Sequence, residues 1–140
     1  MGYTHYWYRA KELPQDLWNE FISDVNFFVI DSPMSDGKNV LAEEYDKPEN
    51  PPIINESEIR FNGKEGGGHE TFYLERVIPE HAQPIREEKF FNFCKTAHKP
   101  YDKYVVEVLS LAEMRFGDLI EISSDGDWEK IKVHCEREKA

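Results

Sequence analysis

The segment from Cys94 to Asp102 gathers side chains that could bind an anion. It leads into a predicted helix, and free backbone amides together with the helix dipole favour a phosphate or carboxylate at that position. The residues that could contribute are Lys95, Thr96, Lys99, Tyr101 and Asp102. The pattern is neither a P-loop nor another fixed phosphate-binding motif, so a solvated loop with Asp102 in the first helical turn is the alternative interpretation.

Two histidines indicate a second kind of chemistry. His69 and Thr71 match one His-x-Thr half of the arrangement in two-histidine phosphoesterases, where one imidazole acts as base and the other as acid. His5 would supply the second imidazole, because both histidines fall on predicted strands that could be neighbours. The residues after His5 do not include the hydroxyl that the second half needs. A structural or stacking role for these histidines is the more common alternative.

The first predicted strand places aromatic rings beside a cation. Its side chains alternate between two faces, so Trp7 and Arg9 could offer a ring and a charge to a base or a ribose-linked purine. Arg60 and Asn62, on a later strand, would add polar contacts. Packing of the rings within the sheet is the plainer interpretation.

Nucleophilic and metal chemistry have weaker support. Cys94 with His98 could form a nucleophile and base, but a small buried thiol is the usual role of a cysteine beside a phenylalanine. The five histidines include no close ligand pair, and the sequence Asp125-Gly126-Asp127 lacks the other ligand positions of an EF-hand loop. The sequence therefore predicts neither a metal nor a cofactor.

Length and composition limit the classes of function. The chain has 140 residues, 39% hydrophobic and 14% aromatic, which suits a single domain over residues 1–140. A formal charge of −11 disfavours direct binding to nucleic acid or an anionic membrane, because both need positive potential. Neither a leader pattern nor a run of about 18 apolar residues occurs, and the two cysteines form no CxxC pair. We therefore expect a cytoplasmic protein without a membrane partner.

Apolar spacing predicts a strand and then a helix at the start of the chain. Residues 3–9 are aromatic and suit a half-buried strand. From Pro14 the apolar residues recur at steps of three and four, which predicts a helix that ends near Asp31. Residues 32–57 show no convincing period, so we expect a long loop that is either a passive excursion or a flexible lid over a ligand.

The rest of the chain reads as strands alternating with helices. Residues 58–62 and 70–75 alternate apolar and polar side chains around a glycine-rich turn, which is typical of a β-hairpin. The later predicted elements are a strand at 90–93, a helix from Pro100 to Gly117, a strand at 119–123 and a last helix. Ser124, followed three residues later by Asp127, resembles an N-terminal capping pattern for that last helix.

Helices interleaved with hairpin-linked strands favour an α+β fold. We expect a mixed, mainly antiparallel sheet with two or three helices packed on one face. A ferredoxin-like variant is one arrangement of this kind.

Five short motifs spread over most of the chain: GYTHYW, IRFNG, HETF, FCKTAHKPYD and SSDGDW. Their combination resembles a family of small, largely uncharacterised proteins from bacteriophages, prophages and bacteria. The resemblance does not cover the 32–57 segment or the irregular stretch that follows Arg76, through Pro79 and Pro84. It implies a phage or bacterial cytoplasmic setting and no established activity. Phage accessory proteins of this size often act against host defences by sequestering or cleaving nucleotide signals.

From these features we expect a protein that binds a small nucleotide-like anion and, in a phage setting, sequesters a host immune signal. The expected ligand contacts are His5, Trp7, Arg9, Arg60, Asn62, His69, Thr71, Lys95, Thr96, Lys99, Tyr101 and Asp102. A metal-independent phosphodiesterase that uses His5, His69 and Thr71 is one alternative, and an acidic protein-interaction or DNA-mimic inhibitor is another. Small ligand-binding proteins are often symmetric homodimers, and we keep that arrangement open.

Overall fold

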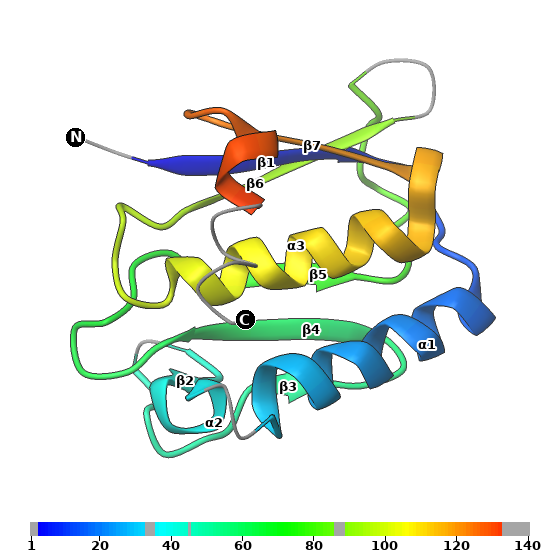
Figure 1. Ribbon diagram of the computed structural model, residues 1–140. Coiled ribbons are helices and arrows are strands. Elements are labelled where there is room, and N and C mark those ends of the chain that lie inside the picture. The colour runs from blue at the N-terminus through cyan, green and yellow to red at the C-terminus, as the bar shows by residue number, and fades with distance from the viewer. Residues whose placement is uncertain (1–2, 33–35, 45, 86–88, 133–140) are drawn as a thin grey trace.

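The computed structural model describes residues 3–32, 36–44, 46–85 and 89–132 as an α+β fold with two antiparallel sheets (Figure 1). Helix α3 (Asp102–Phe116) runs beneath the three-stranded sheet. Helix α1 (Gln15–Val25) and most of the second sheet lie below α3 in this view. The apolar core fills the space between these layers, and the α+β class predicted from the sequence is confirmed.

The central strand of the three-stranded sheet is β1 (Thr4–Arg9), which lies between β6 (Phe90–Lys95) and β7 (Ile120–Ser124). Both pairings are antiparallel. The side chains of β1 alternate as expected for a strand, so His5, Trp7 and Arg9 share the buried face. Tyr6 and Tyr8 lie on the opposite, outer face and are half-buried.

The second sheet is organised around β4 (Glu58–Gly63), which pairs antiparallel with β2 (Leu41–Ala42), β3 (Ile53–Ile54) and β5 (Phe72–Glu75). The predicted hairpin is confirmed, with Phe61 opposite Phe72. Its connection needs glycine for close approach: a Cβ on Gly63 would lie 2.4 Å from the Gly67 carbonyl oxygen, and one on Gly68 would lie 2.1 Å from Asn62 Oδ1.

The two long helices follow the predicted apolar stripes and pack together through aromatic rings. Phe21 of α1 lies edge-on to Phe116 of α3, with ring centroids 5.2 Å apart. α1 continues into a π-helix, η1 (Asn26–Ile30). Its wider turn changes the direction of the apolar side chains that follow α1, and Phe28 is 47% exposed. α3 ends at Gly117, whose φ of 54° suits glycine, and η2 (Gly117–Leu119) leads into β7.

Three features differ from the expectations. The strands form two sheets rather than one, because β4 pairs with short strands from the 32–57 segment, and the sheets meet directly where Trp7 of β1 packs against Phe72 of β5. That segment contains β2, β3 and the short helix α2 (Gly37–Val40), which are too short to produce a sequence period. Ser124 ends β7, and the last helix begins at residue 128 with Asp127 as its cap, since Asp127 Oδ1 accepts the Lys130 amide at 3.3 Å. Cys135 and His134 lie outside the described residues.

Candidate functional site

Four segments meet at one end of the three-stranded sheet, and only two of them, the end of β6 and the start of α3, are close in sequence. There β1 begins while β6 and β7 end, and the strand register sets His5 opposite Cys94 on one side and Ser124 on the other. The N-terminus of α3 reaches the same end and brings Asp102 to the His5 ring. The antiparallel register and the short loop after β6 therefore position this site.

The four segments are joined by a chain of side-chain hydrogen bonds centred on His5. Ser124 Oγ lies 2.6 Å from His5 Nδ1, and His5 Nε2 lies 2.7 Å from Asp102 Oδ1. Thr96 donates its hydroxyl to the same Asp102 oxygen at 2.5 Å. The His5 side chain is 0% exposed and that of Asp102 is 21% exposed, so the bonds are largely shielded from water. We call Ser124, His5, Asp102 and Thr96 the His5 chain.

The charge of Asp102 determines which atoms donate and which accept in the hydrogen bonds of the His5 chain. Burial raises the pKa of its carboxyl, but the hydrogen bonds from His5 and Thr96, together with the His5 and His98 charges, hold the pKa below its usual value. An ionised carboxylate only accepts hydrogen bonds, so the His5 proton belongs on Nε2, facing Asp102. Nδ1 then has a free lone pair, which accepts the Ser124 hydroxyl.

The loop after β6 holds its shape through backbone bonds and two left-handed residues. The amides of Thr96 and Ala97 donate to the Tyr3 carbonyl at 2.9 and 3.1 Å. Ala97 and His98 have φ values of 52° and 57°, which non-glycine residues adopt at a cost. The Lys99 amide then returns to the Thr96 carbonyl at 3.0 Å, which closes the turn ahead of α3.

Tyr3 covers the outer side of His5. Its ring stacks on His98 with centroids 3.7 Å apart and meets His5 edge-on at 5.1 Å. Its hydroxyl reaches the Ser124-Asp125-Gly126 turn, 3.6 Å from the position of a Cβ built on Gly126. Partial burial raises the pKa of Tyr3, and the nearby Asp102 and Asp125 charges raise it further, so the phenol remains a hydrogen-bond donor.

Asn62, an expected ligand contact, instead stabilises the hairpin. It is 0% exposed. Its amide nitrogen donates to the His69 carbonyl at 3.0 Å and to Thr71 Oγ1 at 3.1 Å. Its Oδ1 accepts the amides of Gly63 at 2.8 Å and His69 at 3.1 Å. Both polar atoms are thus occupied within the hairpin, and Thr71 shares that structural role.

Tyr101 and Cys94 join the hairpin to the start of α3. The Tyr101 hydroxyl donates to the Glu70 carbonyl at 2.5 Å, and its amide donates to the Gly67 carbonyl at 3.0 Å. The Cys94 thiol lies 3.8 Å from the Tyr101 hydroxyl and is fully buried. Burial raises the pKa of Cys94 to about 12, so the thiol stays protonated and does not suit a nucleophile.

Trp7, Arg9 and Arg60 do not line the site, which corrects the expectation for these residues. Trp7 is 0% exposed and packs against a core phenylalanine, with ring centroids 5.4 Å apart. Arg9 is also 0% exposed, and its guanidinium donates to backbone carbonyls, including that of Arg76 at 2.8 Å. Burial lowers the pKa of Arg9 to about 10, although the Glu75 charge opposes that shift, so Arg9 remains charged at neutral pH.

Arg60 is held in the second sheet by its own neighbours. It pairs with Glu44 at 3.1 Å and Glu58 at 3.5 Å, and its guanidinium lies 4.8 Å from the centre of the Tyr73 ring. Of the expected cations, only Lys95 and Lys99 are exposed at the end of the sheet that carries the His5 chain.

His69 is exposed on the hairpin connection, and the amide of the next residue, Glu70, donates to the Lys95 carbonyl at the end of β6, 3.2 Å away. Both ring nitrogens of His5 are taken by Ser124 and Asp102, and within the described residues no contact joins the two imidazoles. The two-histidine arrangement is therefore not assembled. Ser124 was missed in the sequence, although its place at the end of a predicted strand, within SSDGDW, was a usable signal.

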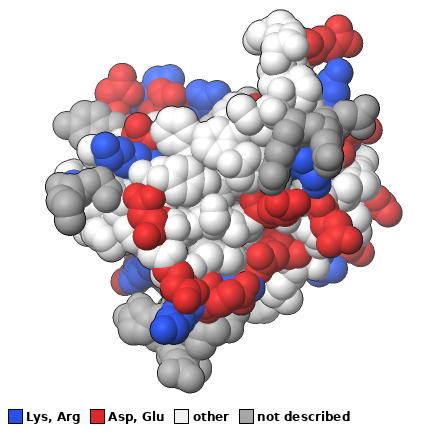
Figure 2. Space-filling view, turned by 90° about the horizontal axis from the view of Figure 1, so that it is seen from above, with Lys and Arg blue, Asp and Glu red and all other residues white. Residues whose placement is uncertain are grey.

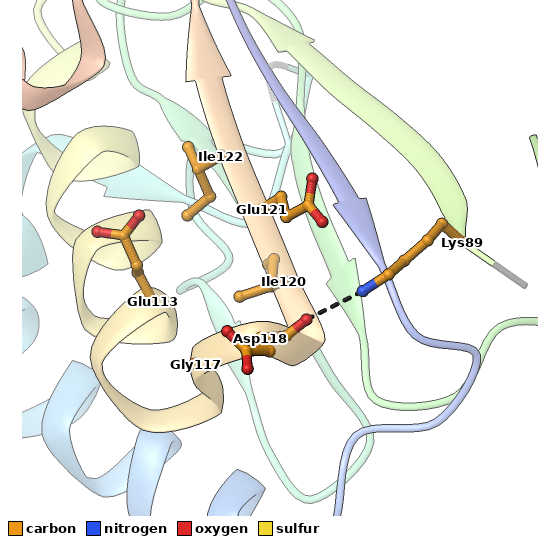
Figure 3. A pocket seen from close by; sticks show the side chains of 7 residues that line it. All are labelled: Lys89, Glu113, Gly117, Asp118, Ile120, Glu121 and Ile122. Carbon is orange, nitrogen blue, oxygen red and sulfur yellow. Dashed lines mark hydrogen bonds between the residues drawn. The ribbon is translucent and has the colours of Figure 1, made fainter. Parts of the chain in front are cut away.

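An open cleft of about 610 Å³ lies at the other end of β7 (Figure 3). Figure 3 shows acidic side chains around an isoleucine floor, with Lys89 reaching across to donate to the Asp118 carbonyl at 2.9 Å. One wall residue, Glu113, is already engaged by Trp128 and Lys132. The cleft contains none of the residues of the His5 chain.

Comparisons with protein-family models, with curated proteins and with solved structures find no match to this chain. Among the residues that the structure describes, no three His, Cys, Asp or Glu side chains gather closely enough to hold a metal ion. No helix in the described ranges has the length and apolar character needed to cross a membrane. The geometry of the site itself must therefore support any functional proposal.

Proposed function

We propose that the protein is a hydrolase in which Ser124 is the nucleophile and His5 is the general base. The continuous link from Ser124 Oγ through His5 to Asp102, with distances of 2.6 and 2.7 Å, carries this proposal. A serine hydroxyl is a weak nucleophile unless an adjacent base takes its proton, and that base needs a third group to orient it. Asp102 would orient the ring, and Thr96 would hold Asp102.

The reaction that suits this geometry is hydrolysis of a carboxylic ester. Ser124 Oγ attacks the carbonyl carbon while His5 Nδ1 takes the hydroxyl proton. The tetrahedral intermediate collapses, the alcohol leaves with the proton from His5, and the acyl group remains on Ser124. Water then attacks the acyl carbon, gives one proton to His5 and releases the acid, and His5 returns that proton to Ser124.

Two neighbouring features support this assignment. The Tyr3 hydroxyl, beside the turn that follows Ser124, would donate to the oxygen that becomes negative in the intermediate. Lys99 is exposed on the loop that follows β6, at the same end of the sheet, and would favour an ester with a negatively charged substituent. Sequestration of a nucleotide has less support, because Trp7, Arg9 and Arg60 are engaged elsewhere.

A fluorophosphonate probe tests the nucleophile. We expect the probe to label Ser124, located by peptide mass mapping, and p-nitrophenyl acetate to be hydrolysed. Ser124→Ala should abolish both signals. Ser123→Ala is the matched control, because Ser123 lies opposite Tyr6 on the outer face and should leave both unchanged.

Asp102→Asn tests the base. It keeps an acceptor for Thr96 but removes the charge that fixes the His5 proton, and turnover should fall by about 10²- to 10⁴-fold. Thermal melting of each variant would check that the fold persists. An unlabelled Ser124, or equal hydrolysis by Ser124→Ala, would refute the proposal. Nucleotides that raise the melting temperature and are recovered intact would support sequestration instead.

A further inference from the structure

The outer face of the three-stranded sheet is a continuous aromatic surface. Tyr6, Tyr8, Phe91 and Phe93 form it, and we call these four residues the aromatic face. Phe91 lies in ring contact with each of the other three, at centroid distances from 5.1 to 6.1 Å. Phe91 is 37% exposed and Phe93 is 53% exposed. Figure 2 looks onto this side of the molecule and shows a white surface across its centre.

The two margins of the aromatic face differ in charge. The register sets Lys95 of β6, Thr4 of β1 and the residue after β7, Asp125, in one row across the sheet. Glu121 occupies the β7 margin in the row of Tyr8. The β6 margin thus carries the Lys95 side chain on this face, with the Glu70 carboxylate bound to the Lys95 amide at the sheet edge, 2.8 Å away, whereas the β7 margin carries Asp125 and Glu121. Figure 2 shows acidic residues gathered along the lower side of the white surface.

The Asp125 carboxylate is fixed on this face. One oxygen accepts the Thr4 amide at 3.0 Å, and the other accepts the Tyr6 hydroxyl at 2.5 Å. The hydrogen bond to Asp125 raises the pKa of the Tyr6 phenol, which therefore stays neutral. A negative charge is thus held in place beside the rings.

We propose that the aromatic face binds the same face of a second copy of this chain. A twofold axis parallel to β1, midway between two facing sheets, sets β6 of one copy over β7 of the other. Lys95 then faces the partner's Asp125, and the tyrosines of β1 face their own counterparts. An axis perpendicular to the strands sets β6 over β6 instead and loses this pairing. The charged margins therefore select the first arrangement.

The same features argue against other occupants. A nucleic-acid strand would bring phosphates to a margin that carries Asp125 and Glu121, on a chain with a formal charge of −11.

Three strands of about six residues, at strand spacings of about 4.8 Å, give a face on the order of 300 Å². This is below the roughly 800 Å² per partner of a stable interface, so we expect a weak dimer that dissociates on dilution.

Sedimentation velocity of the full chain over a range of concentrations tests this dimer. We expect reversible dimerisation at protein concentrations on the order of 100 μM, in the weak-binding range. Phe93→Thr removes an exposed ring from a strand and should abolish the dimer. Met114→Ser is the control, because Met114 is 76% exposed on α3, away from this face, and should leave the dimer unchanged.

A charge exchange tests the orientation. Lys95→Glu should weaken the dimer by about tenfold, because two acids would then face each other. The double variant Lys95→Glu with Asp125→Lys should restore it, whereas a structural effect of either change would not be reversed. A monomer at every concentration, or a dimer that persists in Phe93→Thr, would overturn the proposal. The dimer is independent of the proposed hydrolysis, since Ser124 can be labelled in either state.

Discussion

Replacement of Asn62 by alanine should destabilise the protein strongly without touching the His5 chain. Asn62 is fully buried and makes four hydrogen bonds within the hairpin, two as donor and two as acceptor. A typical bond of this kind contributes about 1 kcal/mol net, and a buried group left without a partner costs about 1–3 kcal/mol. Thr71 is only half-buried and can turn to water, so we expect a loss of about 3–4 kcal/mol.

Urea unfolding followed by far-UV circular dichroism measures this loss. For a domain of this size it corresponds to a fall in melting temperature of about 10 °C. Asn39→Ala is the control, because Asn39 is exposed on α2 and should change stability by less than about 0.5 kcal/mol. A loss below about 1 kcal/mol for Asn62→Ala would contradict the structural role. Asn62 would then regain its place among the candidate ligand contacts.

Three further predictions follow from the site. The Asp102 carboxyl has a lowered pKa in the folded state, so its stabilising effect is full above the unfolded value of about 4 and is lost as the pH falls through the folded value; acid unfolding should therefore be steeper in the wild type than in Asp102→Asn. Cys94, with a pKa near 12 and no exposure, should react with iodoacetamide at pH 8 only when the chain is unfolded, as peptide mass mapping would show, and rapid labelling of the native protein would contradict its burial. Tyr3→Phe should lower ester hydrolysis by up to about 100-fold while the melting temperature changes little, and unchanged turnover would remove Tyr3 from the proposed mechanism.

Much of the secondary structure could be predicted from the sequence, because it depends on local patterns. The three- and four-residue apolar spacing gave the two long helices, and Gly117 ended α3 through its positive φ. The β4–β5 hairpin followed from alternation around the glycines. The strands β2 and β3 could not be predicted, because two residues show no period and exist as strands only through pairing with β4.

The sequence also predicted only part of the site, because some of its contacts depend on tertiary structure. The Cys94–Asp102 segment and His5 were both singled out, and the structure joins them through Thr96 and Asp102. Ser124 was missed, because its contact with His5 depends on the register between β1 and β7, which is a tertiary property. Alternation along β1 predicted that Trp7 and Arg9 share a face, but it could not show that this face is buried.

The central place of β1 affects how the protein is made. Within the described ranges, both strands that pair with β1 lie about 80 to 120 residues later in the chain. At a synthesis rate of about 5–20 residues per second, β1 leaves the ribosome several seconds before its partners. Its aromatic side chains are unpaired during that time, which makes this segment a candidate for chaperone binding. The His5 chain needs residues from both β1 and β7, so shortened chains that lack β7 should lack the proposed ester hydrolysis even where the rest of the chain folds.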